Sequence, residues 1–576
     1  MAVINGNQNN NTLNGNNNQD DQIYGFDGDD TLNGRGGADL LVGGKGNDVY
    51  IIDQLDTLIE LAGEGIDEVR ANFSYTLLEN FENLRLTGTA NINATGNSAN
   101  NEIWGNSGNN VLDGAGGSDI MRGGAGNDIY ITDGGDTLVE SANNGIDEVR
   151  SSATWTLTNN FENLTLTGAA NINGTGNNAN NVIAGNDGNN VLNGGNGVDT
   201  LQMTRASSGP NYLISANLTT GVMTGHGNDT VLNFENVIGT SQSDWITGSA
   251  GNNVLDGAGG SDEFFVTNGV DTIIGGDGND ALRFDNTGPA TADLGAGTYS
   301  LDANNYGTFT SVNHVIGSAF GDTLIGNAEN NHMGGGDGAD YMIGGLGNDQ
   351  IWGGAGNDRL VADFGDDTLS GNSSYINGAD GPGADIFEVR TTAGTVTIND
   401  FEAGIDKLDL TAFGFNSQGV SAYWTASAVQ GQASTDLTLT GQQGEVVEIC
   451  LQGVMPQDGF SVSDMIGGSP SLVPPAPQYP MNGGDGFYTA HLVDPLDIIA
   501  NHGGTLDVFG FEDGLDQLDL RALNLTTSSY WDGWVYDYGP NDQARLEFWG
   551  QNGEFIAINV VGQSYFNMDM SDYLIV

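Results

Sequence analysis

GGKGNDVYI (43–51) and GGAGNDRLV (353–361) are two copies of one nine-residue word, glycine-glycine-x-glycine-x-aspartate-x-apolar-x. Further copies are GGAGNDIYI (123–131), GGDGNDALR (275–283) and GGLGNDQIW (344–352). The glycines permit the positive backbone dihedrals of a tight turn, and the aspartate supplies carboxylate oxygen to a hard cation such as calcium. The apolar residue that follows predicts a short strand with an inward-facing side chain. Stacked words of this kind predict a parallel β-roll with calcium between successive turns.

The sixth position of the word carries the candidate metal ligands. We assign this role to Asp30, Asp39, Asp48, Asp119, Asp128, Asp199, Asp262, Asp280, Asp322, Asp340, Asp349, Asp358 and Asp367. In GNSGNNVLD (105–113), GNDGNNVLN (185–193) and GSAGNNVLD (248–256), asparagine takes this position, as Asn110, Asn190 and Asn253. Because asparagine offers only a neutral oxygen, we expect these coils to bind calcium weakly or to form ladders of side-chain hydrogen bonds.

The composition suits a fold that depends on cations. The 576 residues include 75 acidic and 13 basic side chains, which gives a formal net charge of −62. Such a chain repels itself unless something neutralises it, and calcium that binds only the folded state adds to the folding free energy. The charge disfavours nucleic acid as a partner. Intrinsic disorder is also disfavoured, because hydrophobic residues make up 38% of the chain and recur in register with the glycines.

Repeats divide the solenoid into blocks. Residues 1–24 form an Asn-rich N-terminal cap or the first imperfect coils. Residues 25–202 form a β-roll in which segment 48–97 returns 80 residues later as 128–177, and such a fixed period indicates a solenoid built by duplication. Residues 203–380 form a second block that is interrupted at 203–243 and 284–316. FENVIG (234–239) and VNHVIG (312–317) re-enter the pattern.

The composition changes near residue 381. The segment GADIFEVRTTAGTVTINDFEAGIDKLDLTAF (383–413) has a second copy, PLDIIANHGGTLDVFGFEDGLDQLDLRAL (495–523), at an offset of 110 residues. We therefore predict a β-module at 381–466 and a duplicated β-module at 482–576. Between them, residues 467–481 form a linker that holds five of the eleven prolines, which predicts an extended spacer.

The words resemble those of the RTX family, the bacterial repeat proteins exported by type I secretion, over roughly residues 25–370. The resemblance implies an all-β fold, in which a calcium-binding parallel β-roll or β-helix solenoid precedes two β-sandwich-like C-terminal modules similar to those of serralysin-type proteins. Asp572-Tyr573-Leu574-Ile575-Val576 looks like the uncleaved export signal of that group, and MAVINGNQNNNTLNG lacks the marks of a secretory signal peptide. An extracellular or cell-surface location follows, and no apolar run approaches the ~18 residues of a membrane span.

Motifs of common enzymes are missing from the sequence. The five histidines (His226, His314, His332, His491 and His502) do not form HExxH, and no serine lies in GxSxG. We therefore expect no catalytic activity. His491 and His502 are read as surface or packed residues, with metal ligation as the alternative. Cys450, the single cysteine, is interpreted as a buried thiol without a chemical role.

Two further groups of residues leave alternatives open. The acid pairs Asp406/Asp409 and Asp516/Asp519 lie in turns that enter strands, which favours turn capping or calcium binding over general acid–base chemistry. The aromatic cluster of the last module is interpreted as core or as the seat of the export signal, with a carbohydrate- or subunit-binding face as the alternative. Its members are Trp531, Trp534, Tyr536, Tyr538 and Trp549.

Together these features favour a secreted, calcium-dependent structural protein of the cell surface that self-assembles into an S-layer, sheath or extracellular filament. RTX proteins that form S-layers are known as a type, which supports this function by analogy. The expected partners are further copies of the chain and cell-surface polysaccharide. The alternatives are a secreted protein that binds or acts on carbohydrate, and a calcium-dependent adhesin.

Overall fold

The computed structural model describes residues 2–452 with gaps at 205–212, 226, 286–287, 373–382, 392–393, 414–423, 431–433 and 442–445. Beyond residue 452 it describes the backbone of eight short strands, β49 to β56. Within these ranges every regular element is a β-strand except one 3-10 turn, Thr411–Phe413. The all-β prediction is confirmed.

One nonapeptide word forms one turn and one strand. In GGKGNDVYI the backbone φ is 97° at Gly44 and 133° at Gly46, which glycine adopts readily. The chain then enters β6 (Val49–Ile52), where buried and half-buried side chains alternate. β6 pairs in parallel with β4 (Thr31–Asn33), and the register places Tyr50 beside Leu32, its equivalent two words earlier. Two words therefore make one coil, and equivalent residues of successive coils stack.

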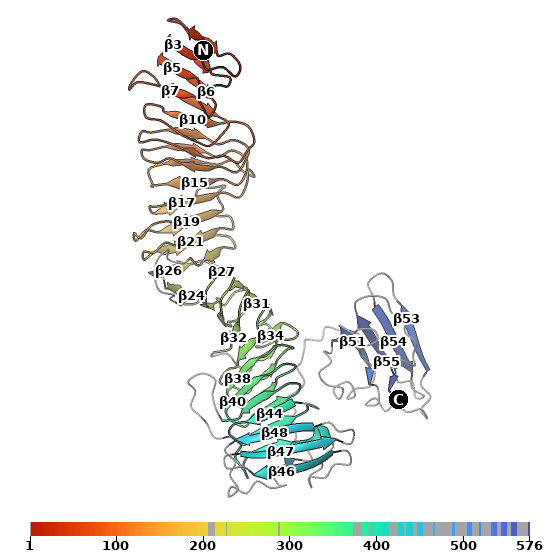
Figure 1. Ribbon diagram of the computed structural model, residues 1–576. Helices are drawn as coiled ribbons and strands as arrows, with labels where there is room; N and C mark the ends of the chain where they lie inside the picture. The colour runs from red at the N-terminus through yellow and green to blue at the C-terminus, as the bar shows by residue number, and fades with distance from the viewer. Residues whose placement is uncertain are drawn as a thin grey trace.

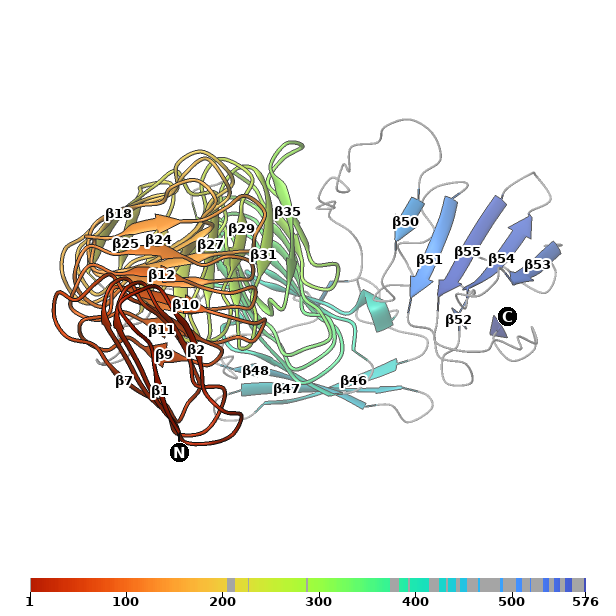
Figure 2. The same ribbon diagram turned by 90° about the horizontal axis from the view of Figure 1, so that it is seen from above.

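At each level the coils contribute strands to two sheets, and the chain winds as a solenoid (Figures 1 and 2). The first sheet contains β1 (Val3–Asn5), β3 (Gln22–Asp27), β5 (Leu40–Lys45) and β7 (Thr57–Ile59). The second contains β2 (Thr12–Asn14), β4, β6, β8 (Glu68–Ala71), β10 (Asn83–Leu86), β12 (Glu102–Trp104), β14 (Ile120–Arg122) and β16 (Thr137–Val139). The neighbouring strands within these two sheets are parallel.

Each 80-residue unit contains one break in a sheet. The first sheet ends at β7, and a third ladder begins at β9 (Tyr75–Thr76) and continues through β11 (Ala94–Thr95), β13 (Val111–Asp113), β15 (Ile129–Thr132) and β17 (Glu148–Ser151). The second sheet ends at β16, and a fourth begins at β18 (Trp155–Thr156). The breaks fall at equivalent places in the two copies of the duplicated segment, so the repeat in sequence is also a repeat in structure.

A single hydrophobic core runs along the inside of the coils. Leu32, Tyr50, Val69 and Leu84 lie in register on successive rungs, and all four are fully buried. The two 80-residue units also carry matching aromatic pairs. The ring centroids of Tyr50 and Phe81 and those of Tyr130 and Phe161 are both 5.1 Å apart. Edge-to-face pairs of this kind add to the stability that burial provides.

The two predicted interruptions contain antiparallel insertions. β24 (Ile214–Asn217), β25 (Val222–Thr224) and β26 (Asn228–Leu232) form one, and β33 (Thr291–Asp293), β34 (Thr298–Ser300) and β35 (Tyr306–Thr310) form the other. The parallel ladder continues across each insertion, since β22 (Val191–Asn193) pairs with β26 and β31 (Val270–Ile274) pairs with β35. FENVIG and VNHVIG supply β27 (Asn236–Ile238) and β36 (His314–Ile316), as the re-entry of the pattern predicts.

The parallel ladders cross the boundary that the sequence places near residue 381. β41 (Arg359–Ala362) pairs with β43 (Ile386–Val389), and β42 (Asp367–Ser370) pairs with β44 (Gly394–Ile398). β44 then pairs in parallel with β48 (Val446–Gln452), which continues antiparallel into β47 (Ser434–Gly441) and β46 (Trp424–Gln430). The first module thus begins as further coils and ends in an antiparallel sheet. Residues 2–24 likewise form β1, β2 and part of β3, in register with the coils that follow.

The second module repeats this pairing scheme. β51 (Gly504–Phe509) pairs in parallel with β55 (Phe555–Val561), as β44 does with β48. β53 (Asp532–Asp537), β54 (Gln543–Trp549) and β55 are antiparallel, as are β46, β47 and β48. β52 (Leu518–Asp519) pairs with β56 (Leu574–Ile575), as β45 (Lys407–Asp409) does with β49 (Met465–Ile466). The 110-residue duplication in sequence is therefore also a duplication of topology.

Candidate calcium sites

All thirteen sixth-position aspartates assigned from the sequence are buried, with at most 2% of each residue exposed to solvent. The nine-residue word accounts for this burial, because its aspartate lies at or just before the start of a strand. Asp48 immediately precedes β6, for example, and Asp358 immediately precedes β41. Charged carboxylates are seldom buried in proteins unless they are paired or bind a metal.

One oxygen of each carboxylate in the dense blocks is held by the neighbouring coil. Oδ1 of Asp48 accepts a hydrogen bond of 2.7 Å from the backbone N–H of Asp30. Oδ1 of Asp358 accepts one of 2.9 Å from the N–H of Asp340, and Oδ1 of Asp367 one of 2.9 Å from Asp349. The aspartates therefore form ladders along the solenoid, in which each carboxylate joins two successive coils.

The second oxygen of most of these carboxylates has no hydrogen-bond partner. This holds for Oδ2 of Asp30, Asp39, Asp48, Asp128, Asp199, Asp262, Asp280, Asp340, Asp349, Asp358 and Asp367. A buried acceptor that lacks a partner costs on the order of 1–3 kcal/mol, and more when it is charged. A hard cation with oxygen ligands removes that cost. The residues present therefore fit calcium.

Backbone carbonyls of the turns are also close at hand. The carbonyl oxygen of Gly338 points at Gly356 in the next coil, where a Cβ atom would lie only 1.4 Å from it. The same contact joins Gly260 and Gly278. Glycine is required at Gly356 and Gly278 both by this close approach and by φ values of 143° and 134°. A Cβ atom at Gly335 would lie 2.2 Å from Oδ2 of Asp340 and 2.4 Å from the carbonyl oxygen of Gly353, so carbonyl and carboxylate oxygens of successive coils lie close together there.

The electrostatics of the ladder favour a bound cation. Burial, reinforced by the charges of Asp358, Asp322 and Asp337, raises the pKa of Asp340 to about 9. Burial and the neighbouring Asp280, Asp244 and Asp256 raise the pKa of Asp262 to about 8. The pKa of Asp349 rises to about 7, again chiefly through burial. Ionised carboxylates in this ladder are therefore unfavourable without a compensating positive charge.

In the asparagine words, hydrogen bonds satisfy the buried side chain at the sixth position, and no cation is needed. Nδ2 of Asn110 donates to the carbonyl of Ile92 at 2.7 Å and to Oδ1 of Asn106 at 3.1 Å. Asn190 donates in the same way to Ile172 and Asn186. Asn253 and Asn331 likewise donate to one carbonyl and one side chain. Asn101 and Asn181 each donate to two backbone carbonyls instead. The predicted ladders of side-chain hydrogen bonds are present, and the weaker calcium binding of these coils stays a prediction.

Asp322 departs from the other assigned aspartates. Its word has serine instead of glycine at the second position, and the backbone N–H and hydroxyl of Ser318 both donate to the carboxylate. The N–H of Ala290 donates as well, at 2.6 Å. Because both oxygens of Asp322 have partners, this carboxylate is less in need of calcium than those of the words that follow it.

The structure adds carboxylates that the word search missed. Asp67 and Asp147 occupy the sixth position of the degenerate words AGEGIDEVR (62–70) and ANNGIDEVR (142–150), and both are buried. Asp229 and Asp385 are also buried, and each has an unpartnered Oδ2. The 80-residue repetition of GIDEVR was a signal for the first two. Thr224 to Leu232 matches the word at its second, fourth, sixth and eighth positions, so that Asp229 was also detectable.

Other candidates from the sequence have structural roles or lie outside the described residues. Asp406 accepts a hydrogen bond from the N–H of Glu402 in its own turn, as turn capping predicts, and another from the N–H of Asp385 in the neighbouring coil. Asp409 pairs with Arg359 at 2.8 Å and accepts from Thr411. His314 and His332 stack with ring centroids 4.6 Å apart. Cys450, predicted to be buried, is only half-buried, because it lies on the more exposed face of β48. His226, His491, His502 and Asp516 lie outside the described residues, as do the side chains of Asp519 and of the aromatic cluster in the last module.

The described residues were searched for helices that could span a membrane. Among them, no helix has the length and apolar character needed to cross a bilayer.

Comparison with known proteins assigns the repeat. The RTX calcium-binding nonapeptide repeat matches residues 16–50, 95–130, 175–202, 234–264, 256–286, 316–351 and 334–369. No curated protein matches the chain. Among solved structures, the AlgE6R3 subunit of the mannuronan C5-epimerase from Azotobacter vinelandii is similar, with 22% identity, a TM-score of 0.18 and coverage of 29% of this chain and 88% of that chain. The AlgE6R2 subunit of the same enzyme is 26% identical, with a TM-score of 0.14 and coverage of 27% and 94%. The family model thus shows RTX calcium-binding nonapeptide repeats in these segments, and the thirteen assigned sixth-position aspartates, all of which lie within them, are buried.

Proposed function

We propose that this protein is a structural component of a bacterial cell surface, which is exported, folds on binding calcium and assembles with further copies of itself into a lattice, sheath or filament. The observation that carries the proposal is the continuity of the stack. Parallel pairing links successive coils from β1 to β49, and one hydrophobic core extends from Ile23 to Leu451. A long rod with a single core, in which one coil supports the next, suits a load-bearing or space-filling role.

Dependence on calcium connects folding of this protein with a location outside the cell. RTX repeats are typical of secreted proteins. The ladder leaves carboxylates unpartnered along the solenoid, and sites with affinities of extracellular modules fill only near millimolar calcium, as found outside cells. We propose that the chain leaves the cell unfolded through a type I channel and folds outside. The acidic and hydrophobic C-terminal residues that would direct this export lie outside the described residues, apart from the backbone of Leu574–Ile575.

Imaging and sedimentation of the purified protein test the assembly proposal. In roughly millimolar calcium, electron microscopy should show ordered sheets or filaments, and sedimentation should show large particles. Excess chelator should dissolve them, and magnesium should not restore them, because it demands tighter octahedral geometry and keeps its waters. A protein that stays monomeric in calcium over the micromolar concentration range would contradict self-assembly and leave calcium binding itself intact.

A second function, binding of acidic polysaccharide, is favoured by a stripe of arginine and tryptophan on the second sheet. The register places Arg70, Arg85, Trp104 and Arg122 side by side on successive strands, and the guanidinium of Arg85 lies 4.4 Å from the ring centroid of Trp104. Such residues suit sugar rings and carboxylate groups. Glu68 and Glu102 pair with these arginines and offset part of the charge. Co-sedimentation with an acidic polysaccharide should weaken in Trp104→Ala and persist in Trp245→Ala, whose tryptophan lies on another sheet.

A further inference from the structure

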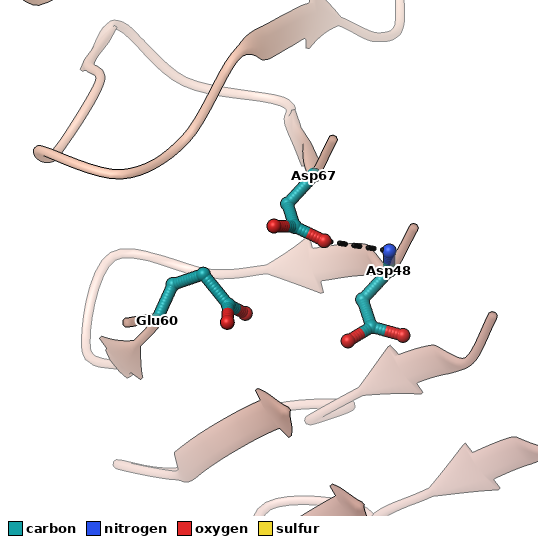
Figure 3. A group of neighbouring side chains, drawn as sticks. All are labelled: Asp48, Glu60 and Asp67. Atoms are coloured by element: carbon teal, nitrogen blue, oxygen red, sulfur yellow. Dashed lines mark hydrogen bonds between the residues drawn. The ribbon is translucent and has the colours of Figure 1, made fainter. Parts of the chain in front are cut away.

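Two clusters of three carboxylates lie at the breaks between sheets, and each contains a glutamate from outside the nonapeptide words. The first comprises Asp48, Glu60 and Asp67, and the second comprises Asp128, Glu140 and Asp147. In each cluster one carboxylate oxygen per residue lies within 4.8 Å of the others. Figure 3 shows the three carboxylates of the first cluster turned toward one shared space.

The spacing suits a single ion. Calcium binds oxygen at about 2.3–2.6 Å, so that two ligands on opposite sides of the ion are separated by no more than about 5 Å. Three carboxylate oxygens within 4.8 Å of one another can therefore share one calcium ion. All three residues of the first cluster are at least nine-tenths buried, with exposed fractions of 1% for Asp48, 7% for Glu60 and 0% for Asp67.

Unpartnered oxygens point to a ligand in each cluster. Oδ1 of Asp67 accepts a hydrogen bond of 2.7 Å from the N–H of Asp48, but Oδ2 of Asp48 and Oδ2 of Asp67 have no hydrogen-bond partner. In the second cluster Oδ1 of Asp147 accepts from Asp128 at 2.8 Å, and Oδ2 of Asp128 has no partner. Burial, and after it the charges of neighbouring carboxylates, raises the pKa of Asp48 to about 6 and the pKa values of Glu60 and Asp67 to about 7.

The glutamate is held in place by a tyrosine of the core. The hydroxyl of Tyr50 accepts a hydrogen bond of 2.6 Å from the N–H of Gly43 and donates to Oε2 of Glu60. Tyr130 makes the same two contacts, with Gly123 at 2.5 Å and with Glu140 at 2.6 Å. Each hydroxyl also lies near a backbone carbonyl, that of Ile59 at 3.2 Å and that of Val139 at 3.4 Å, but its contact with the glutamate is shorter and holds the carboxylate in place. The tyrosine occupies the apolar position of the word and thus joins the core to the cluster.

The break in the sheet explains how a glutamate reaches the aspartates. Glu60 directly follows β7, the last strand of the first sheet, and Glu140 directly follows β16, the last strand of the second. In both copies the carboxylate of this residue lies next to the sixth-position aspartates of two successive coils. The segments that match the nonapeptide repeat include Asp48 and Asp128 but exclude Glu60, Asp67, Glu140 and Asp147.

We propose that each 80-residue unit builds an additional calcium site, formed by Asp48, Glu60 and Asp67 in the first unit and by Asp128, Glu140 and Asp147 in the second. The site uses three acidic side chains, whereas a word contributes one. It holds the coils together where a sheet ladder is interrupted, so that the ion takes over part of the role of the missing strand pairing. The proposal does not depend on self-assembly.

The duplication provides an internal control for the test. Hydrogen exchange of the full-length protein is followed by mass spectrometry during a calcium titration, with peptides that cover 57–70 and 137–150. In the unaltered chain both regions should gain protection on binding calcium. Glu60→Gln keeps the shape of the side chain and an oxygen to accept from Tyr50 but removes one ligand charge. It should raise the calcium midpoint of 57–70 at least about tenfold and leave that of 137–150 unchanged.

Two further variants complete the design. Glu140→Gln should produce the mirror-image result, and Glu79→Gln, at an exposed glutamate of the same unit, should change neither region. Equal midpoints in Glu60→Gln and the unaltered chain would overturn the proposal. Protection of both regions in excess chelator would also contradict it.

Discussion

Replacing Asp349 by asparagine should have opposite effects on stability with and without calcium. Oδ1 of Asp349 accepts a hydrogen bond of 2.8 Å from the N–H of Asn331, and Oδ2 is buried without a partner. In the natural asparagine words, the amide nitrogen donates to a carbonyl of the preceding coil, as Asn331 does to Asn313 at 2.8 Å. Asp349→Asn should form the same bond, to the carbonyl of Asn331, because His332 and Gln350 pair in register. It lacks the second acceptor that Asn327 gives Asn331, since Gly345 takes that place in its word.

The structure sets the magnitude of the effect. Burial raises the pKa of Asp349 from 3.8 to about 7. An ionised Asp349 in metal-free protein at pH 8 therefore costs roughly 4 kcal/mol at most, and about 2 kcal/mol if neighbouring solvent relieves part of it. Asp349→Asn should stabilise the metal-free fold by about that amount. In calcium the variant lacks a charged ligand, and we expect a loss of about 1.5–3 kcal/mol, as for other interactions with charged groups.

At pH 8 the β signal that remains in excess chelator reports the first effect, and urea unfolding in calcium measures the second. Asn110→Asp is the reverse control, since it places a carboxylate in a word that is satisfied by amide bonds. It should destabilise the metal-free protein and make its stability more dependent on calcium. The reasoning is refuted if Asp349→Asn shifts stability in the same direction in both conditions, or if the two substitutions act alike.

Three other predictions follow from the ladders and the modules. In chelator, the β-sheet circular dichroism signal should be stronger at pH 5 than at pH 8. Aspartates such as Asp340 and Asp349, with pKa values of about 9 and about 7, bind protons more tightly in the folded than in the unfolded chain. The stability that they contribute is therefore present below about pH 4 and is lost as the pH rises through the folded pKa values. Calcium affinity, measured by titration, should change in the opposite sense and weaken toward pH 5, because protons compete for the same oxygens; equal affinity at both pH values would count against carboxylate ligands. Deletion of residues 482–576 should retain the protein inside the cell in a secretion assay, and the module at 381–466 should not compensate; normal export of the shortened chain would contradict a C-terminal signal.

The nonapeptide word predicts more of the fold than of the site. Its glycines and apolar residues placed the turns and strands, and the register that stacks Tyr50 on Leu32 follows from the two-word coil. The antiparallel insertion at 214–232 was visible only as an interruption, because β24 and β25 carry no repeating glycine pattern, although the word is partly kept at 224–232. The ladders crossing residue 381 were missed for a related reason: Asp385 follows a segment whose spacing differs from that of the earlier words.

The contacts of the side chains decide which carboxylates need calcium, and the sequence does not show these contacts. Whether an aspartate needs calcium depends on groups such as Ser318, which satisfies Asp322 although the sixth-position residue itself fits the pattern. Glu60 lies outside any word, and its place beside Asp48 and Asp67 depends on the end of a sheet at β7. Spacing along the chain does not reveal such contacts, since they join separate coils.

The central claim, that calcium completes a fold whose carboxylates are otherwise uncompensated, is tested most directly by far-ultraviolet circular dichroism of the full-length protein during calcium removal and return at pH 8. The account predicts that excess chelator abolishes most of the β signal, that roughly millimolar calcium restores it, and that equal magnesium does not. An unchanged β signal in excess chelator, or full recovery in magnesium, would contradict it.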